Sequence, residues 1–200
     1  GYAHANGVVH CDVKPGNIMV DAGGNVYLTD FGIARHADST TTTMGAAGTP
    51  AYMAPEQIRG EAVNAATDVY AMGIMLFEML TGRRPFEGKE LKTSGETGAT
   101  QANLIRTAHL TQPPPDPHSL NPAVSPAMAS VLLKALEKKP QDRFQDIMQF
   151  FSAFCKATSV TLEQIPDRLL KYVRGSEEPP PPPPPPPPTK RALPFILGFV

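Results

Sequence analysis

Four polar residues in the first part of the chain have the types and spacing that phosphoryl transfer requires. Asp12, Lys14 and Asn17 lie within one short stretch, and Asp30 follows 18 residues after Asp12. A carboxylate can accept the proton of an attacking hydroxyl, and a lysine ammonium can face a phosphate. An amide and a second carboxylate supply the oxygen ligands that Mg²⁺ prefers. The set predicts a site that moves a phosphoryl group from a magnesium-bound nucleotide to a hydroxyl.

The stretch between these residues predicts how they are brought together. Short runs rich in apolar and β-branched residues at 18–20 and 26–29 flank a turn sequence at 21–25, which indicates a β-hairpin. Because a hairpin folds back on itself, it would bring Asn17 close to Asp30.

The remainder of the folded part has a helical pattern. Before the helices begin, residues 33–53 show no periodicity, which indicates a long exposed loop of a kind that is usually functional. A cap at Thr67 or Asp68 would begin a buried apolar helix that ends at Thr81, before Gly82. Other predicted features are a flexible insertion at 88–100 and helices at 101–110, from Ser125–Pro126, at 142–156, and near 161–175 with a capping box of Thr161 and Gln164.

Composition and charge limit the class of protein. The chain has 200 residues, of which 41% are hydrophobic and 18% charged, which is typical of one soluble domain with a tail. The net charge of −1 gives no general attraction to nucleic acid, so no nucleic-acid partner is expected. Two cysteines, Cys11 and Cys155, cannot form a disulfide framework and favour a reducing cytosol. We expect Cys155 to be a small core residue on a helix.

Three blocks of sequence, 8–17, 29–35 and 48–56, together resemble the larger lobe of serine/threonine protein kinases, over residues 1–155. The residues in these blocks are most similar to those of the bacterial eukaryotic-type branch, many of whose members are single-pass membrane receptors. The resemblance implies a mainly α (α+β) fold, a kinase-like C-terminal lobe with a small β-hairpin at the catalytic cleft. The N-terminal lobe, with its glycine-rich loop and strand lysine, would be missing from this chain.

The resemblance also assigns roles to individual residues. Asp12 would be the catalytic base, and Lys14 would face the transferred phosphate of ATP, while Thr49 would bridge these two side chains. Asn17 and Asp30 would bind ATP through Mg²⁺ as its protein ligands. Each residue also has a purely structural alternative, such as a turn carboxylate for Asp12 or a solvated surface lysine for Lys14.

Other residues are expected to support the fold rather than the chemistry. By the resemblance, Glu56 and Arg143 form a buried ion pair, and Asp68 holds the catalytic stretch through its backbone amides. His10 would be a packing residue, and Phe31 with Gly32 a packing wedge and a hinge. The other histidines (His4, His36, His109 and His118) are expected at the surface, and the methionines, such as Met72, Met75 and Met79, in the core.

Cys11 departs from the kinase pattern, because most kinases carry arginine at this place. That arginine pairs with a phosphate on the activation loop, and a thiol cannot form such a bidentate, charge-assisted contact. We therefore hypothesise that activity does not require phosphorylation of Ser39 or of Thr40 to Thr43.

The C-terminal part changes in composition. Residues 156–178 are predicted to be a helical extension and linker, and 179–189 a spacer with ten consecutive prolines. Lys190–Arg191 and the apolar residues after them make 190–200 the start of a possible transmembrane segment, with a short apolar tail as the alternative. The kinase part would then be cytoplasmic, in a single-pass plasma membrane protein.

The leading functional hypothesis is ATP-dependent phosphorylation of Ser/Thr hydroxyls on protein substrates, with ATP and Mg²⁺ as cofactors. The chain alone would be inactive, because its cleft would lack one side. One alternative is a pseudokinase or binding scaffold that keeps the fold without turnover. A third possibility is an adaptor whose proline run docks an aromatic groove.

Overall fold

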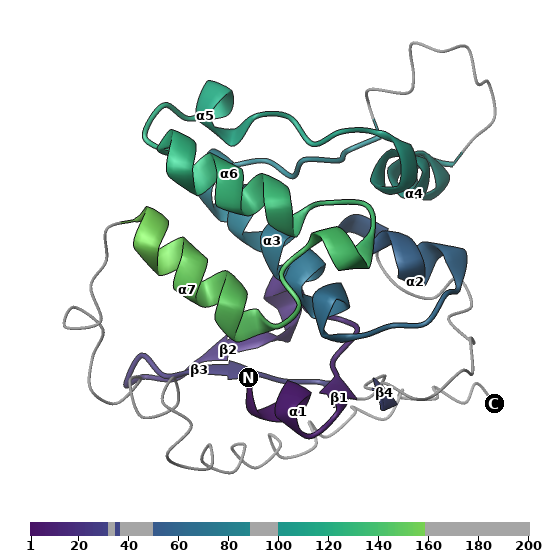
Figure 1. Cartoon of the computed structure of the whole chain (residues 1–200), viewed down its shortest axis with the longest axis vertical. Coiled ribbons are helices and arrows are strands. Elements are labelled where there is room, and N and C mark those ends of the chain that lie inside the picture. Colours follow the sequence, from purple (N-terminus) through teal and green to yellow (C-terminus); the bar gives the residue numbers. More distant parts are fainter. Residues whose placement is uncertain (32–34, 37–49, 89–99, 159–200) are drawn as a thin grey trace, which may run out of the picture.

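The computed structural model describes residues 1–31, 35–36, 50–88 and 100–158, which form a mainly helical fold with two small sheets (Figure 1). The helices are α1 (Tyr2–Ala5), α2 (Pro55–Arg59), α3 (Ala65–Thr81), α4 (Gln101–Thr111), α5 (Pro117–Leu120), α6 (Pro126–Ala135) and α7 (Ile147–Ala157). The strands are β1 (Val8–Val9), β2 (Ile18–Val20), β3 (Val26–Leu28) and β4 (Arg35–His36), and short 3-10 turns are η1 (Pro15–Asn17), η3 (Pro50–Tyr52) and η5 (Pro140–Asp142). The predicted mainly α composition is confirmed for these residues.

Both sheets are two-stranded and antiparallel. β2 pairs with β3 with Met19 opposite Tyr27, and the carboxylate of Asp21 accepts hydrogen bonds from the Gly23 and Asn25 amides of the turn (2.8 and 2.9 Å). The predicted hairpin is therefore confirmed. The other sheet pairs β1 with β4, which joins the start of the chain to the stretch after Asp30–Phe31.

Helix α3 runs through the middle of the molecule. Asn64 caps it by accepting a hydrogen bond from the Ala66 amide, and Thr67 Oγ1 accepts in turn from the Asn64 amide. The predicted start at Thr67 or Asp68 was wrong, because Thr67 serves the cap from inside the helix. The predicted end is confirmed, since Gly82 takes the left-handed conformation (φ 74°) that stops a helix.

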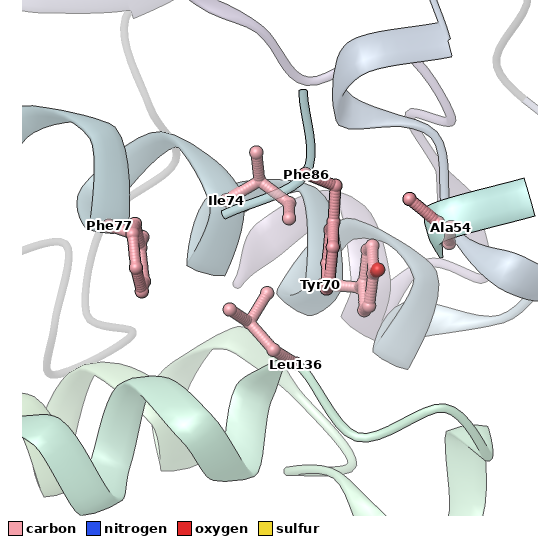
Figure 2. Packing of buried hydrophobic residues seen from close by; sticks show 7 residues of the cluster. Ala54, Tyr70, Ile74, Phe77, Phe86 and Leu136 are labelled. Atoms are coloured by element: carbon pink, nitrogen blue, oxygen red, sulfur yellow. The ribbon is translucent and has the colours of Figure 1, made fainter. Parts of the chain in front are cut away.

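The core is built on opposite faces of α3. On one face, Tyr70, Ile74 and Phe77 pack with Phe86 and Leu136, and Figure 2 shows the Leu136 side chain directed towards this helix. On the other face, the core residues are Val69, Leu132, Ala135 and Phe150, which come from α3, α6 and α7.

Close packing of α3 against α6 depends on a glycine. A Cβ at Gly73 would lie 3.0 Å from Ala135 Cβ and 3.2 Å from Leu136 Cδ2, tighter than most Cβ contacts, so α6 would have to move by a few tenths of an ångström to admit a side chain. The methionine prediction holds for Met75, which is buried, and was wrong for Met79, whose side chain is 72% exposed near the end of α3.

The other helices test the predictions made from local signals. Helix α4 matches the predicted span at 101–110 to within one residue, and α6 begins as predicted, with Ser125 Oγ accepting from the Met128 amide. The helix predicted from 142 begins only at Ile147, because Asp146 is its cap and η5 precedes it. Cys155 lies on α7, half-buried rather than in the core.

Some predictions fall on residues outside the described ranges. They include most of the insertion predicted at 88–100, most of the loop predicted at 33–53, the helix near 161–175, the proline run and the apolar segment at 190–200. Within the described ranges, no helix is both long enough and apolar enough to cross a bilayer.

Candidate active site

Three of the predicted site residues meet directly. Lys14 Nζ lies 2.6 Å from Asp12 Oδ2, and Asn17 Nδ2 donates to the same oxygen at 3.0 Å and to the Asp12 carbonyl at 2.8 Å. The side chains of Lys14 and Asp12 remain 28% and 25% exposed, so a substrate can reach them. Two donors on Oδ2 fix the orientation of the carboxylate and leave Oδ1 as its second acceptor.

The hairpin brings the residue before Asp30 against Asn17. The amide and hydroxyl of Thr29 both donate to the Asn17 carbonyl, at 2.8 and 3.1 Å, which fixes the residue before Asp30 against Asn17. Asp30 is exposed and has a φ of 64°. Thr49 lies outside the described residues, so its bridge between Asp12 and Lys14 stays a prediction.

Asp68 holds the backbone just before Asp12 in place. Its carboxylate accepts from the amides of His10 (2.8 Å) and Cys11 (2.9 Å), as expected. Cys11 has a φ of 67°, a left-handed conformation that costs a residue other than glycine about 1–2 kcal/mol. Hydrogen bonds to an ionised acceptor are among the stronger ones, so Asp68 stabilises this strained backbone. His4 Nε2 also contacts Asp68 Oδ2 at 2.7 Å, with its side chain only 11% exposed, so its predicted surface position was wrong.

His10 links the two segments of the site. The Asp12 amide donates to Nδ1 (3.2 Å), so the ring proton is on Nε2, which donates to the Thr29 carbonyl (3.0 Å). The ring is buried and meets Phe31 edge-on, with ring centroids 4.5 Å apart. The prediction of a packing histidine is confirmed.

Gln57 also supports the site, and the sequence reasoning missed it. Its Nε2 donates to the Cys11 carbonyl at 2.8 Å, and its Oε1 accepts from the Ala54 amide at 3.0 Å at the start of α2. The signal that could have found it is its place three residues after the cap of a short helix.

Glu56 and Arg143 form the predicted buried ion pair. The guanidinium donates to both carboxylate oxygens (2.8 and 2.7 Å), and the two side chains are 0% and 1% exposed. Thr67 Oγ1 donates to Glu56 Oε1, and Arg143 also donates to the Ala66 carbonyl. The fully satisfied pair joins α2 and α3 to the segment before α7.

Tyr52 fixes the segment that precedes α2. Its hydroxyl donates to Glu78 Oε2 on α3. Burial, together with this carboxylate, raises the pKa of Tyr52 to about 12, so the phenol remains a donor at neutral pH. Arg84 lies 3.8 Å from the other oxygen of Glu78.

The donors at Asn17 and Asp30 are suited to a magnesium–nucleotide complex. Asn17 uses Nδ2 towards Asp12, so Oδ1 is the atom left for a cation, and Asp30 adds an exposed carboxylate. Mg²⁺ binds through one or two protein oxygens together with substrate phosphates and water. In the described part of the chain, no cluster of three or more His, Cys, Asp or Glu residues forms a metal site on its own.

Comparison with known proteins gives consistent matches. A family model described as "Protein kinase domain" matches residues 1–154. Serine/threonine-protein kinase Pkn1 of Myxococcus xanthus is 45% identical over 158 residues, which cover 76% of this chain and 21% of that protein. PknB of Mycobacterium leprae is 42% identical and PrkC of Bacillus subtilis 40%; each match covers 72% of this chain, and 22% and 21% of those proteins. The chain thus spans about a fifth of the length of these relatives.

Proposed function

The chain belongs to the protein kinase family, in the bacterial eukaryotic-type branch of serine/threonine kinases, and on that premise we propose that it carries the catalytic residues of an ATP-dependent enzyme that phosphorylates Ser or Thr hydroxyls of proteins. The observation that carries the proposal is the convergence of Lys14 and Asn17 on the carboxylate of Asp12.

Asp12 would act as the base. Lys14 and Asn17 occupy Oδ2, so Oδ1 would accept the proton of the incoming hydroxyl as its oxygen attacks the γ-phosphorus. The bond from that phosphorus to the β-phosphate oxygen would break in the same transfer, with ADP as the leaving group. The Lys14 ammonium, once a phosphate is present, also lies where it can offset negative charge on the transferred group.

Asn17 Oδ1 and Asp30 would hold the magnesium of Mg-ATP, which neutralises charge on the phosphates. Thr29 fixes their relation by hydrogen-bonding the Asn17 carbonyl immediately before Asp30. The two proposed magnesium ligands therefore come from opposite ends of the hairpin: Asn17 precedes its first strand and Asp30 follows its second.

The segment 50–54, called the docking segment below, would receive the substrate polypeptide next to Asp12. Tyr52 anchors it to α3, and Gln57 connects its end to the Cys11 carbonyl. A surface held by hydrogen bonds before the substrate arrives needs little reorganisation on binding.

The decisive test uses the full-length protein with Mg-ATP and a generic acceptor protein. Asp12→Asn should lower the rate of phosphoryl transfer by about 10²–10⁴-fold, the range for loss of a positioned base. Its melting temperature should stay close to that of the wild type. Asp116→Asn is the matched control, because Asp116 is an exposed cap of α5 and asparagine caps helices equally well.

Two results would argue against the proposal. A wild-type protein that transfers no phosphate and gains no thermal stability from Mg-ATP would refute it. Nucleotide binding without any turnover would favour the binding-scaffold alternative.

We also propose the larger layout that the resemblance implies. Residues 1–155 would be the larger lobe of the kinase, and residues 190–200 would begin a membrane segment. The support for the second is the basic pair Lys190–Arg191 followed by apolar residues. Fractionation of cells that make the full-length protein tests it, since recovery only in the soluble fraction would contradict membrane attachment.

A further inference from the structure

Two histidines that were predicted at the surface are buried, and each has one unpartnered ring nitrogen. His109 on α4 is 0% exposed, and its Nδ1 lies 2.9 Å from the Tyr70 hydroxyl in the core. His4 on α1 has a side chain only 11% exposed, and its Nε2 lies 2.7 Å from Asp68 Oδ2. Among the described residues, Nε2 of His109 and Nδ1 of His4 have no hydrogen-bond partner. The partner of His4 belongs to the site, because Asp68 holds the backbone before Asp12.

The contact with Asp68 determines which nitrogen of His4 is the donor. An ionised carboxylate only accepts hydrogen bonds, so Nε2 must carry a proton. Nδ1 is then a buried polar atom without a partner among the described residues, which destabilises the folded protein. An apolar side chain at position 4 would avoid that cost. The hydrogen bond to a charged acceptor is stronger than one between neutral groups, so it is the contact that offsets the cost.

His4 completes a set of three donors around a buried charge. The Asp68 side chain is 6% exposed. Its Oδ1 accepts from the Cys11 amide at 2.9 Å, and its Oδ2 accepts both from the His10 amide at 2.8 Å and from His4. Without His4, two backbone amides alone would compensate the buried charge, and the carboxylate would rotate more freely about its Cβ–Cγ bond.

The two amides that this carboxylate accepts belong to residues that lead directly to the reacting groups. Cys11, in its left-handed conformation, is followed by Asp12. The His10 ring accepts from the Asp12 amide at 3.2 Å and contacts the Thr29 carbonyl, next to Asp30, at 3.0 Å. A shift of the His10 backbone would therefore disturb both segments of the site.

We infer that His4 is a positioning residue for phosphoryl transfer: through Nε2–H it fixes the Asp68 carboxylate, which sets the backbone that carries Asp12. In this role it acts through Asp68 and contacts neither the nucleotide nor the acceptor hydroxyl. The inference rests on the proposed function, in which Asp12 is the base. Helix α1 packs against β1, so a short helix outside the catalytic stretch contributes to the geometry of the base (Figure 1).

The test compares four variants of the full-length protein. His4→Leu removes both ring nitrogens. His4→Gln places an amide donor as far along the side chain as Nε2, whereas His4→Asn places one only as far as Nδ1. His118→Leu is the matched control, because His118 is exposed on α5 and its ring contacts a backbone carbonyl, that of Val124.

Two properties are measured below the onset of thermal unfolding of each variant. The first is hydrogen exchange of the His10 and Cys11 amides, which report directly on the contacts with Asp68. The second is the separate values of kcat and of KM for Mg-ATP and for an acceptor protein.

We expect His4→Leu and His4→Asn to speed exchange of the His10 and Cys11 amides at least about tenfold, as for loss of a hydrogen bond to a charged group. The kcat should fall about three- to tenfold while both KM values change less than about twofold, because the base is displaced and the binding contacts are kept. His4→Gln should recover most of both effects, and His118→Leu should show neither.

Three results would overturn the inference: unchanged exchange in His4→Leu, an unchanged kcat in that variant, or equal recovery by asparagine and glutamine. The last would assign the effect to any polar group at position 4 rather than to a donor at Nε2. If the wild-type protein transfers no phosphate but exchange changes as expected, the proposed function fails, and the role in transfer with it, while the contact stands. If phosphate is transferred and exchange does not change, the inference alone fails.

Discussion

Among single residues, Cys11 has the clearest consequence for regulation. Its side chain is buried (6% exposed), and Sγ lies 3.7 Å from the Val9 carbonyl. A neutral, buried thiol offers no cation to a phosphate on the loop that follows Asp30. The backbone just before Asp12 is instead held by Asp68, whose carboxylate accepts hydrogen bonds from the amides of His10 and Cys11.

Changing Ser39 and Thr40 to Thr43 together to alanine should therefore leave at least about half of the wild-type activity of the full-length protein, because charge pairing needs a cation at position 11. Initial rates with Mg-ATP and an acceptor protein, measured on phosphatase-treated samples, test this. A near-complete loss of activity in the alanine variant would contradict the hypothesis.

His109 predicts how stability depends on pH. Burial, with Lys138 and Arg84 nearby, lowers its pKa from 6.5 to about 3. Between these values the unfolded chain binds more protons than the folded protein, so stability falls as pH drops below about 6.5 and this penalty is absent above it. One group can contribute up to about 1.4 kcal/mol per pH unit.

Urea unfolding at pH 7.5 and pH 5.0 checks this expectation. The wild-type protein should lose more free energy of unfolding between the two pH values than His109→Gln, which has no titrating group at this position. Equal losses in the two proteins would show that His109 does not remain neutral in the folded state.

The histidines also show where single-residue prediction failed. Patterns could place Asp12, Lys14 and Asn17 in one group, because their spacing is local. Nothing in the residue type of His4 or His109 indicates burial, because their partners Asp68 and Tyr70 lie 64 and 39 residues away.

Among the elements, the Glu56–Arg143 pair connects α2 and α3 to the segment before α7. Breaking it from one side leaves a buried, unpaired guanidinium, so Glu56→Gln should cost about 3–5 kcal/mol of the free energy of unfolding. Adding Arg143→Met should recover part of this loss, because the orphaned charge is removed.

Urea denaturation measures both variants. Glu61→Gln is the control, because Glu61 is half-exposed and its contact with Arg59 is 3.5 Å long, so its stability should stay close to that of the wild type. A Glu56→Gln protein as stable as this control would mean that the buried pair is not formed.

Some helix ends are determined by residues at the end itself, and others by contacts with residues that are distant in the sequence. Ser125 with Pro126, and Gly82 after Thr81, act on their own helix ends, so the sequence predicted these ends correctly. The start of α7 was missed because Arg143 is extended (φ −86°, ψ −178°) where the helix was expected. Its guanidinium has to reach Glu56, 87 residues earlier, and no local pattern records that contact.

Across the whole molecule, the hairpin carries an apolar surface that the described helices leave open. Val20 and Val26, which pair across the two strands, are 65% and 63% exposed, and Met19 is 50% exposed. Phe31, which follows the hairpin in sequence, is 45% exposed. Figure 1 places this hairpin at the end of the molecule opposite α4 and α5. The relatives are about five times longer than this match, and we propose that a further part of the full-length kinase covers this face.

The polypeptide 1–200 should therefore bind an apolar dye more strongly than the full-length protein, and Mg-ATP should raise its melting temperature less. Dye fluorescence and thermal unfolding, each with and without Mg-ATP, measure both effects on equal molar amounts. Equal nucleotide stabilisation of the two polypeptides would contradict the proposed need for a second lobe.

The left-handed backbone at Cys11 and Asp30 has a consequence for how this protein can evolve. Glycine would relax the backbone at both positions. At position 11 it would also remove a buried side chain that packs with Val9 and Val63. At position 30, glycine would also remove a carboxylate proposed to hold the nucleotide's cation, whereas position 11 carries no such charge. The two positions are therefore constrained for different reasons: packing retains a side chain at position 11, and the proposed cation binding retains a carboxylate at position 30 for as long as the organism depends on turnover.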